Sequence, residues 1–165
     1  MIILGLDPGT AITGYGIVKT KEKNKKFFVV DYGCIFTKPD LSTGDRLKRI
    51  YRETGKLIKK HKPDLVSIEN IYFFKNLKTA MPVSQARGVI LLAAAKKNIP
   101  VCEVTPLQVK MAIVGYGRAE KKQVQGMIKK LFTLKEKPED KGKRKDDATD
   151  ALGVAVCGAL KYYTI

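Results

Sequence analysis

The segment Met1-Ile-Ile-Leu-Gly-Leu-Asp7-Pro-Gly-Thr10 begins with an apolar run of the length of a buried strand. An acidic residue and a glycine turn follow this run. A carboxylate at the end of a buried strand is costly unless it is paired, binds a metal ion or bonds to the backbone of a turn. Residues 2–7 are therefore predicted to form a strand with Asp7 at its end. The motif by itself leaves open whether Asp7 binds a metal ion or only starts the turn.

Three further acids lie in segments where a charge is expensive. Glu69 directly follows the apolar run Leu65-Val-Ser-Ile68, where it is either a functional acid or a solvent-facing strand residue. Asp147 and Asp150 open an apolar helical pattern and, being three residues apart, share one face of the helix. Asp146 competes with Asp147 for the first of these positions, and either residue also suits a helix N-terminus. Acids that repel one another in this way predict a divalent metal site.

The charge balance predicts a polyanionic partner. The 165 residues contain 32 Lys and Arg against 16 Asp and Glu, a formal net charge of +16. Such an excess attracts nucleic acid through phosphate contacts and counterion release, although part of it also serves solubility. No apolar run approaches the ~20 residues of a membrane span, and the N-terminus lacks the pattern of a signal peptide. Because its three widely spaced cysteines predict reduced thiols, the chain is expected to be cytoplasmic, with no membrane partner.

Apolar periodicity predicts the order of secondary structure. Strands are expected at 2–7, 15–18, 27–36, 65–68 and 101–104, and helices at 42–61, 79–97, 106–113, 119–131 and 147–160. A turn is expected at 9–14, a basic hairpin loop at 19–26 and a charged, mobile loop at 133–145. His61 is expected at the surface, where a cation suits the end of a helix. Three leading strands followed by alternating helices and strands predict an α/β fold: a mixed β-sheet of about five strands with helices on both faces, in a single domain spanning residues 1–165.

A strand-end acid, a central-strand acid and helix acids, in this order, resemble the ribonuclease H-like nucleases. A longer set of motifs is similar to the RuvC-type Holliday-junction resolvases of bacteria and covers nearly the whole chain. These motifs are Leu4-Gly-Leu-Asp7-Pro-Gly-Thr10, Gly14-Tyr-Gly16, Ile68-Glu69 followed by an aromatic, Gln85-Ala-Arg-Gly88, Gln108-Val-Lys110, Val114-Gly-Tyr-Gly117, Ala119-Glu-Lys121-Lys-Gln-Val-Gln125 and Asp147-Ala-Thr-Asp150-Ala-Leu152. Asp-x-Gly-Thr also occurs in actin-like ATPases, but that fold needs two such domains in a longer chain.

The resemblance implies a ribonuclease H-like fold and a role for each matched residue. The catalytic, metal-binding carboxylates are expected to be Asp7, Glu69, Asp147 and Asp150, which would hold two Mg²⁺ ions, with Mn²⁺ as a substitute. Lys110 and Lys121 are expected near the scissile phosphate, as catalytic and DNA-binding residues. Further DNA contacts are expected from Tyr72, which would stack on a base near the crossover and where many relatives carry Phe, and from Lys75 and Arg87. Phe73 and Phe74 either insert into the DNA or pack within the protein, and one is expected to do each.

The predicted function is that of a metal-dependent, structure-selective endonuclease that resolves four-way (Holliday) DNA junctions in recombination and repair. Paired symmetric cleavage would give 5′-phosphate and 3′-hydroxyl ends. The resemblance implies a homodimer and a branch-migration helicase complex as partner, and the helix predicted at 79–97 is apolar on more than one face, as a dimer contact requires. Two alternatives stay open: a ribonuclease H-like RNA-processing nuclease, which should lack the paired lysine motifs, and a DNA-junction-binding protein that does not cleave, against which the intact carboxylates argue.

Overall fold

The computed structural model describes residues 1–21, 26–70, 77–134 and 144–163, and within these ranges it contains one five-stranded sheet. The strands are β1 (Ile2–Asp7), β2 (Ile12–Lys21), β3 (Lys26–Phe36), β4 (Leu65–Glu69) and β5 (Val101–Val104). Their order across the sheet is β3-β2-β1-β4-β5, in which β2 pairs antiparallel with β1 and β3, and β4 pairs parallel with β1 and β5. This mixed sheet confirms the predicted fold class.

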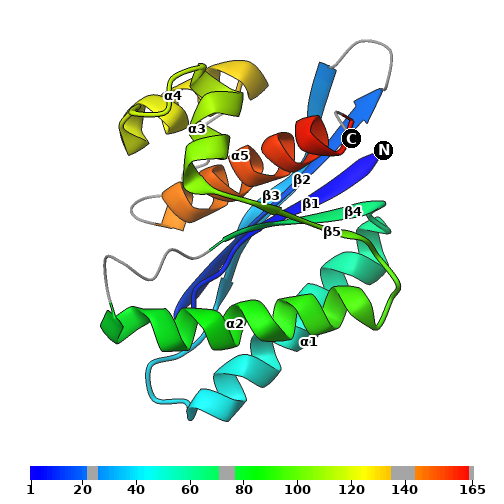
Figure 1. The fold of residues 1–165 in the computed structure, drawn as a ribbon. Helices are drawn as coiled ribbons and strands as arrows, with labels where there is room; N and C mark the ends of the chain where they lie inside the picture. Colours follow the sequence, from blue (N-terminus) through cyan, green and yellow to red (C-terminus); the bar gives the residue numbers. More distant parts are fainter. Residues whose placement is uncertain (22–25, 71–76, 135–143, 164–165) are drawn as a thin grey trace.

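Helices cover both faces of the sheet (Figure 1). They are α1 (Thr43–His61), α2 (Leu77–Ala95), α3 (Pro106–Val114), α4 (Lys121–Phe132) and α5 (Arg144–Tyr162). α1 and α2 pack together over one face, whereas α5 crosses the other face and is contacted there by α3 and α4. Within the described residues, no helix is both long and apolar enough to cross a membrane.

The central strand β1 separates two hydrophobic cores. Leu4 and Leu6 pack in the core beneath α1 and α2, whereas Ile3 packs in the core beneath α5. Successive side chains of a strand point to opposite faces of the sheet. Asp7 therefore lies on the same side as Ile3, which is the side that α5 covers.

Element limits differ from the sequence-based prediction at the turns. β2 begins at Ile12, inside the turn expected at 9–14, and β2 and β3 extend into the hairpin loop expected at 19–26. The longer ladder forms because Thr20, opposite Phe27, is buried and Phe27 packs against the core beneath α5. α5 begins at Arg144, three residues earlier than the sequence predicts.

The prediction that His61 lies at the surface is wrong. Its side chain is 9% exposed, and its Nε2 lies 3.1 Å from Oδ2 of Asp31 on β3. Lys60 pairs with the same oxygen at 2.9 Å. The end of α1 is thus tied to a strand thirty residues earlier in the chain, a contact that the helical periodicity of 42–61 does not reveal.

Candidate active site

Asp7 and Glu69 end two neighbouring parallel strands. Leu6 of β1 lies opposite Ile68 of β4. The two acids that follow them therefore lie side by side at the C-terminal ends of these strands. Ser67 faces α5, since its hydroxyl donates a hydrogen bond of 2.8 Å to a backbone carbonyl of that helix. Glu69, two residues further on, shares this side of the strand, and both carboxylates are therefore directed toward α5.

Helix α5 brings Asp147 and Asp150 to the C-terminal ends of β1 and β4 because the backbone of α5 lies directly against β2. Gly14 of β2 is the partner of Asp7 in the β1–β2 ladder. The backbone carbonyl of Asp147 occupies the space that a Cβ atom on Gly14 would need. One carboxylate oxygen from each of Asp7, Asp147 and Asp150 lies within 4.8 Å of the other two. Three carboxylates this close offer the oxygen ligands that Mg²⁺ prefers.

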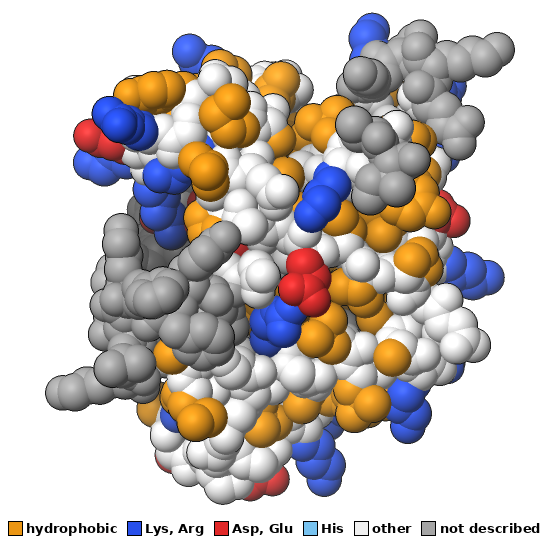
Figure 2. Space-filling view, viewed as in Figure 1, with side chains coloured by type: hydrophobic (Ala, Val, Ile, Leu, Met, Phe, Trp, Pro, Cys, Tyr) orange, Lys and Arg blue, Asp and Glu red, His pale blue; other side chains and the backbone are white. Residues whose placement is uncertain are grey.

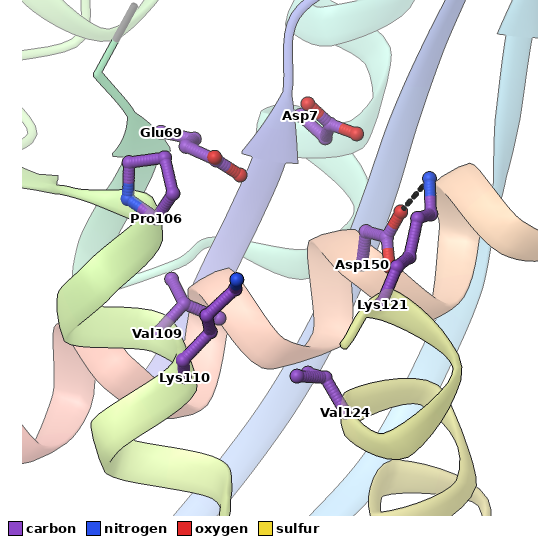
Figure 3. Close-up of a pocket in the computed structure, with 8 residues that line it drawn as sticks. All are labelled: Asp7, Glu69, Pro106, Val109, Lys110, Lys121, Val124 and Asp150. Carbon is purple, nitrogen blue, oxygen red and sulfur yellow. Dashed lines mark ion pairs between the residues drawn. The ribbon is translucent and has the colours of Figure 1, made fainter. Parts of the chain in front are cut away.

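A cleft of about 250 Å³ opens beside this cluster (Figure 3). Acidic side chains reach it from β1, β4 and α5, and two lysines extend toward it from α3 and α4. The lining residues are Asp7, Glu69, Pro106, Val109, Lys110, Lys121, Val124 and Asp150. The cleft therefore offers ligands for a cation and ammonium groups for an anion in one space.

Local hydrogen bonds fix the starts of the two helices that carry these lysines. At α3, Oγ1 of Thr105 accepts from the backbone N–H of Gln108 at 3.1 Å, and the Gln108 side chain accepts in return from the backbone N–H of Thr105 at 2.9 Å. This reciprocal pair is a capping box. At α4, the side chain of Gln123 accepts from the backbone N–H of Glu120 at 2.8 Å. Both lysine-bearing helices consequently begin at defined points beside the cleft.

Burial and mutual repulsion weaken the acidity of the carboxyl groups. Burial, together with the charges of Glu69, Asp150 and Asp147, raises the pKa of Asp7 to about 8. Burial and the charge of Asp150 raise the pKa of Glu69 to about 7, and burial also raises the pKa of Asp147. A bound cation relieves both effects, so the donor set fits a divalent metal ion.

Helix α4 contributes a cation and an amide to the site. Nζ of Lys121 lies 2.7 Å from Oδ2 of Asp150, and Nε2 of Gln125 donates to Oδ1 of the same carboxylate at 3.1 Å. Partial burial acts to lower the pKa of Lys121, but the hydrogen bond to Asp150 and the charges of Asp147 and Asp7 raise it overall. The sequence motifs predicted no role for Gln125. Its spacing of four residues from Lys121, which places both on one helix face, is the signal that points to it.

The other predicted site residues lie away from the cleft or outside the described ranges. Arg87 on α2 pairs with Glu103 of β5 at 2.6 Å and exposes 20% of its side chain, so its guanidinium is engaged within the molecule. Asp146 lies in the first turn of α5 but, among the described residues, belongs neither to the carboxylate cluster nor to the cleft lining. Tyr72, Phe73, Phe74 and Lys75 fall within 71–76, outside the described residues.

A mixed five-stranded sheet with acids at the ends of two adjacent strands, faced by a helix that carries two more, defines the ribonuclease H-like class of fold. Within that class, the family model for "Crossover junction endodeoxyribonuclease RuvC" matches residues 3–158. The chain belongs to this family.

Individual relatives and solved structures agree with this assignment. The crossover junction endodeoxyribonuclease RuvC of Alkaliphilus metalliredigens is 55% identical over 159 residues, which cover 96% of this chain and 93% of the relative. The structure of Thermus thermophilus RuvC in complex with a Holliday junction substrate is similar with a TM-score of 0.87 at 29% identity, covering 99% of this chain and 96% of the other. The yeast mitochondrial Holliday junction resolvase Ydc2 is similar in fold, with a TM-score of 0.67 at 17% identity over 98% of this chain and 82% of its own.

Proposed function

We propose that this chain is a metal-dependent endonuclease that resolves four-way DNA junctions. The observation that carries the proposal is the convergence of Asp7, Asp147 and Asp150 within 4.8 Å, beside a cleft that also contains two lysines. Phosphodiester hydrolysis requires that charge on the phosphate be neutralised and that a water be activated. Carboxylates that hold metal ions, next to ammonium groups, meet both requirements. Membership of a family named for this activity supports the same conclusion.

The overall charge supports DNA as the substrate. The chain has a formal net charge of +16, and Figure 2 shows Lys and Arg side chains around much of one face with few acidic ones. Thermus thermophilus RuvC was solved with a Holliday junction substrate. A four-way junction carries the phosphates of four duplex arms into one region, so a strongly basic protein gains many contacts there. Junction DNA is therefore the substrate that we assign.

Asp7, Asp147 and Asp150 are the proposed metal ligands, with Glu69 beside them in the cleft. The set contains only oxygen donors, which suits two Mg²⁺ ions per site, with Mn²⁺ as a substitute. When bound, such ions activate a water and stabilise the leaving 3′-oxygen. The products would carry 5′-phosphate and 3′-hydroxyl ends.

Lys110 and Lys121 are proposed to act on the scissile phosphate. Both line the cleft, Lys110 from α3 and Lys121 from α4, where Lys121 pairs with Asp150. Positive charge that is already in place where negative charge develops lowers the barrier without a reorganisation cost. We assign charge stabilisation to these lysines, and we assign the reaction no protein nucleophile.

Paired cleavage needs two active sites, and α2 offers a surface to join two copies. Ala86 and Ile90 of α2 are buried in the molecule, whereas Met81 and Leu92 are 67% and 52% exposed. Met81 and Leu92 are eleven residues apart, close to three helical turns, and therefore share a face. An apolar helix face suits an isologous contact. The proposal includes a homodimer of single-domain chains spanning 1–165, acting in the cytoplasm with a branch-migration helicase complex.

Tyr72 lies three residues after Glu69 in the sequence, and we propose that it stacks on a base left unpaired at the crossover. Stacking of this kind is sequence-tolerant because every base has a π-face. Phe73, Phe74 and Lys75 are proposed as neighbouring DNA contacts. Arg87 would join them only by releasing Glu103, its partner at 2.6 Å.

A comparison of three substrates tests the proposal. The purified protein is incubated with Mg²⁺ and a four-way junction, a linear duplex of the same sequence or a structured RNA. Symmetric nicks in the junction alone are expected. Preferential cleavage of the RNA would favour an RNA-processing nuclease, and tight junction binding without cleavage would favour a non-catalytic binding protein. Asp7→Asn is the control that should bind the junction without cutting it.

A further inference from the structure

Both oxygens of the Asp150 carboxylate are held by side chains of α4. Lys121 Nζ lies 2.7 Å from Oδ2, as Figure 3 shows, and Gln125 Nε2 donates to Oδ1 at 3.1 Å. Lys121 and Gln125 are four residues apart and thus occupy one face of the helix. One carboxylate of the proposed metal site is therefore oriented from a separate helix.

The two contacts differ in how freely they can be broken. The Lys121 side chain is 61% exposed, so its flexible stem can leave Asp150 without exposing a buried group. Gln125 is only 6% exposed, and a buried amide that loses its hydrogen bond has no water to replace it. The contact to Oδ2 is thus exchangeable, whereas the contact to Oδ1 persists.

An apolar contact lies one turn further along the same two helices. Gly153 of α5 lies against Ile128 of α4, whose Cδ1 atom is 2.9 Å from the position that a Cβ on Gly153 would occupy. Ile128 follows Gln125 by three residues, and Gly153 follows Asp150 by three residues. The apolar pair and the polar pair are therefore successive contacts along the same helix–helix interface.

We infer that Gln125 is a positioning residue that keeps the Asp150 carboxylate turned toward the site, and that Lys121 is a built-in counter-ion that occupies Oδ2 until a divalent cation displaces it. This inference rests on the metal site proposed above and adds a regulation of its affinity. Gln125 leaves Oδ2 of Asp150 available to a metal ion. The ammonium of Lys121, once displaced, remains at the cleft that would receive the phosphate.

Two substitutions on α4 should therefore change the affinity for a divalent cation in opposite directions. Gln125→Leu keeps the volume of the side chain but removes the donor, so the carboxylate loses its fixed orientation and cation affinity should fall. Lys121→Met removes the competing charge, so cation affinity should rise. A purely structural role for α4 would move both affinities in the same direction, with the loss of stability.

Calorimetric titration of the DNA-free protein with Mn²⁺ tests this directly. We expect Gln125→Leu to bind about tenfold more weakly than the natural chain, as for other outer partners of metal ligands, and Lys121→Met to bind more tightly. Lys122→Met is the matched control: it removes one ammonium from the same turn of α4, but Lys122 is exposed and outside the cleft lining, so its affinity should be unchanged. Thermal melting in EDTA identifies a variant that fails to fold, and Gln125→Met then replaces Gln125→Leu.

Three outcomes would overturn the inference. The first is a folded Gln125→Leu or Gln125→Met protein with the affinity of the natural chain. The second is weaker binding by Lys121→Met. The third is a natural chain that binds no Mn²⁺, which overturns the proposed metal site as well. Only this third result contradicts both proposals, so failure of the inference is distinguishable from failure of the proposed function.

Discussion

The backbone carbonyl of Asp147 lies where a Cβ atom of Gly14 would stand, so α5 rests on the backbone of β2 with no side chain between them. Gly14 is also the ladder partner of Asp7. The strand-end acid and the helix acid are brought together through this one glycine. The carboxylate cluster therefore depends on a close approach of two backbones as much as on the acids themselves.

Gly14→Ala should destabilise the protein and open the cluster. A methyl group in this space must push α5 away from β2, and overpacking of this kind typically costs about 1–3 kcal/mol. Urea unfolding measures the loss, and Mn²⁺ titration should show weaker binding. Gly55→Ala is the control, because nothing lies within 4 Å of the added Cβ and the change to Ala within a helix should stabilise by about 1 kcal/mol. A Gly14→Ala protein with unchanged stability and unchanged Mn²⁺ affinity would show that α5 does not lie against β2 as described.

Among the helix acids, Asp147 and Asp150 should be essential and Asp146 dispensable. Asp147 and Asp150 share the 4.8 Å cluster with Asp7, whereas Asp146 is not part of it. Asp147→Asn and Asp150→Asn should abolish Mg²⁺-dependent junction cleavage, and Asp146→Ala should retain most of it. Gel assays of junction nicking with the three variants give the answer. An inactive Asp146→Ala beside an active Asp147→Asn would move the site by one residue.

Without metal, the free energy of unfolding should fall as pH rises between about pH 4 and pH 8. The pKa of Asp7 rises from 3.8 to about 8 and that of Glu69 from 4.5 to about 7 in the folded protein. In this window the folded state binds more protons than the unfolded chain, so raising the pH favours unfolding. A cation replaces those protons, and Mg²⁺ should therefore stabilise the protein more at high pH than at low pH.

Melting curves in EDTA and in Mg²⁺ across this pH window measure the effect. Asp7→Asn supplies the control, because it removes the group with the larger shift and should flatten the EDTA profile. A natural chain whose melting temperature in EDTA rises steadily up to about pH 8 would contradict the assignment of protonated acids to the metal-free site.

Lys110→Ala and Lys121→Ala should slow cleavage of bound junction far more than they weaken binding. Both lysines line the cleft, and loss of a preorganised charge-stabilising group typically slows the chemical step about 100-fold or more. Single-turnover cleavage at saturating protein separates the two quantities. Lys122→Ala, an exposed neighbour outside the cleft lining, should leave the cleavage step unchanged. Equal losses in binding and cleavage would show that both lysines only contact DNA phosphates and do not act in the cleavage step.

Leu92→Glu should dissociate the proposed dimer. Leu92 of α2 is 52% exposed, and a charge buried in an apolar contact between copies is costly. Light scattering at micromolar concentration should show the natural chain as a dimer and the variant as a monomer. Leu131→Glu on α4 is the matched control, since Leu131 is 57% exposed but lies on another helix. A monomeric natural chain, with and without junction DNA, would contradict the dimer.

Much of the fold and of the candidate site was predictable because the relevant signals are local. Strand alternation places Asp7 on the same face as Ile3, and the spacing of Asp147 and Asp150 places both on one side of a helix. Neither inference needs to know which element lies opposite. The apolar runs likewise indicated which segments are buried. Glu69, which the motif resemblance grouped with the other acids, lies outside the three-carboxylate cluster but lines the same cleft as Asp7 and Asp150.

Contacts between elements were decided by the tertiary structure alone. That Gln125 holds Asp150, that His61 meets Asp31 and that Arg87 pairs with Glu103 depend on how helices and strands pack. Periodicity reports which face of an element is buried but not its rotation and register against a distant neighbour. Those are set by close packing of shapes, here by the carbonyl of Asp147 over Gly14 and by Ile128 over Gly153. The sequence by itself therefore determined which acids this protein carries and the faces on which they lie. Only the packing of the elements decided how these acids are oriented and that Lys121 pairs with Asp150.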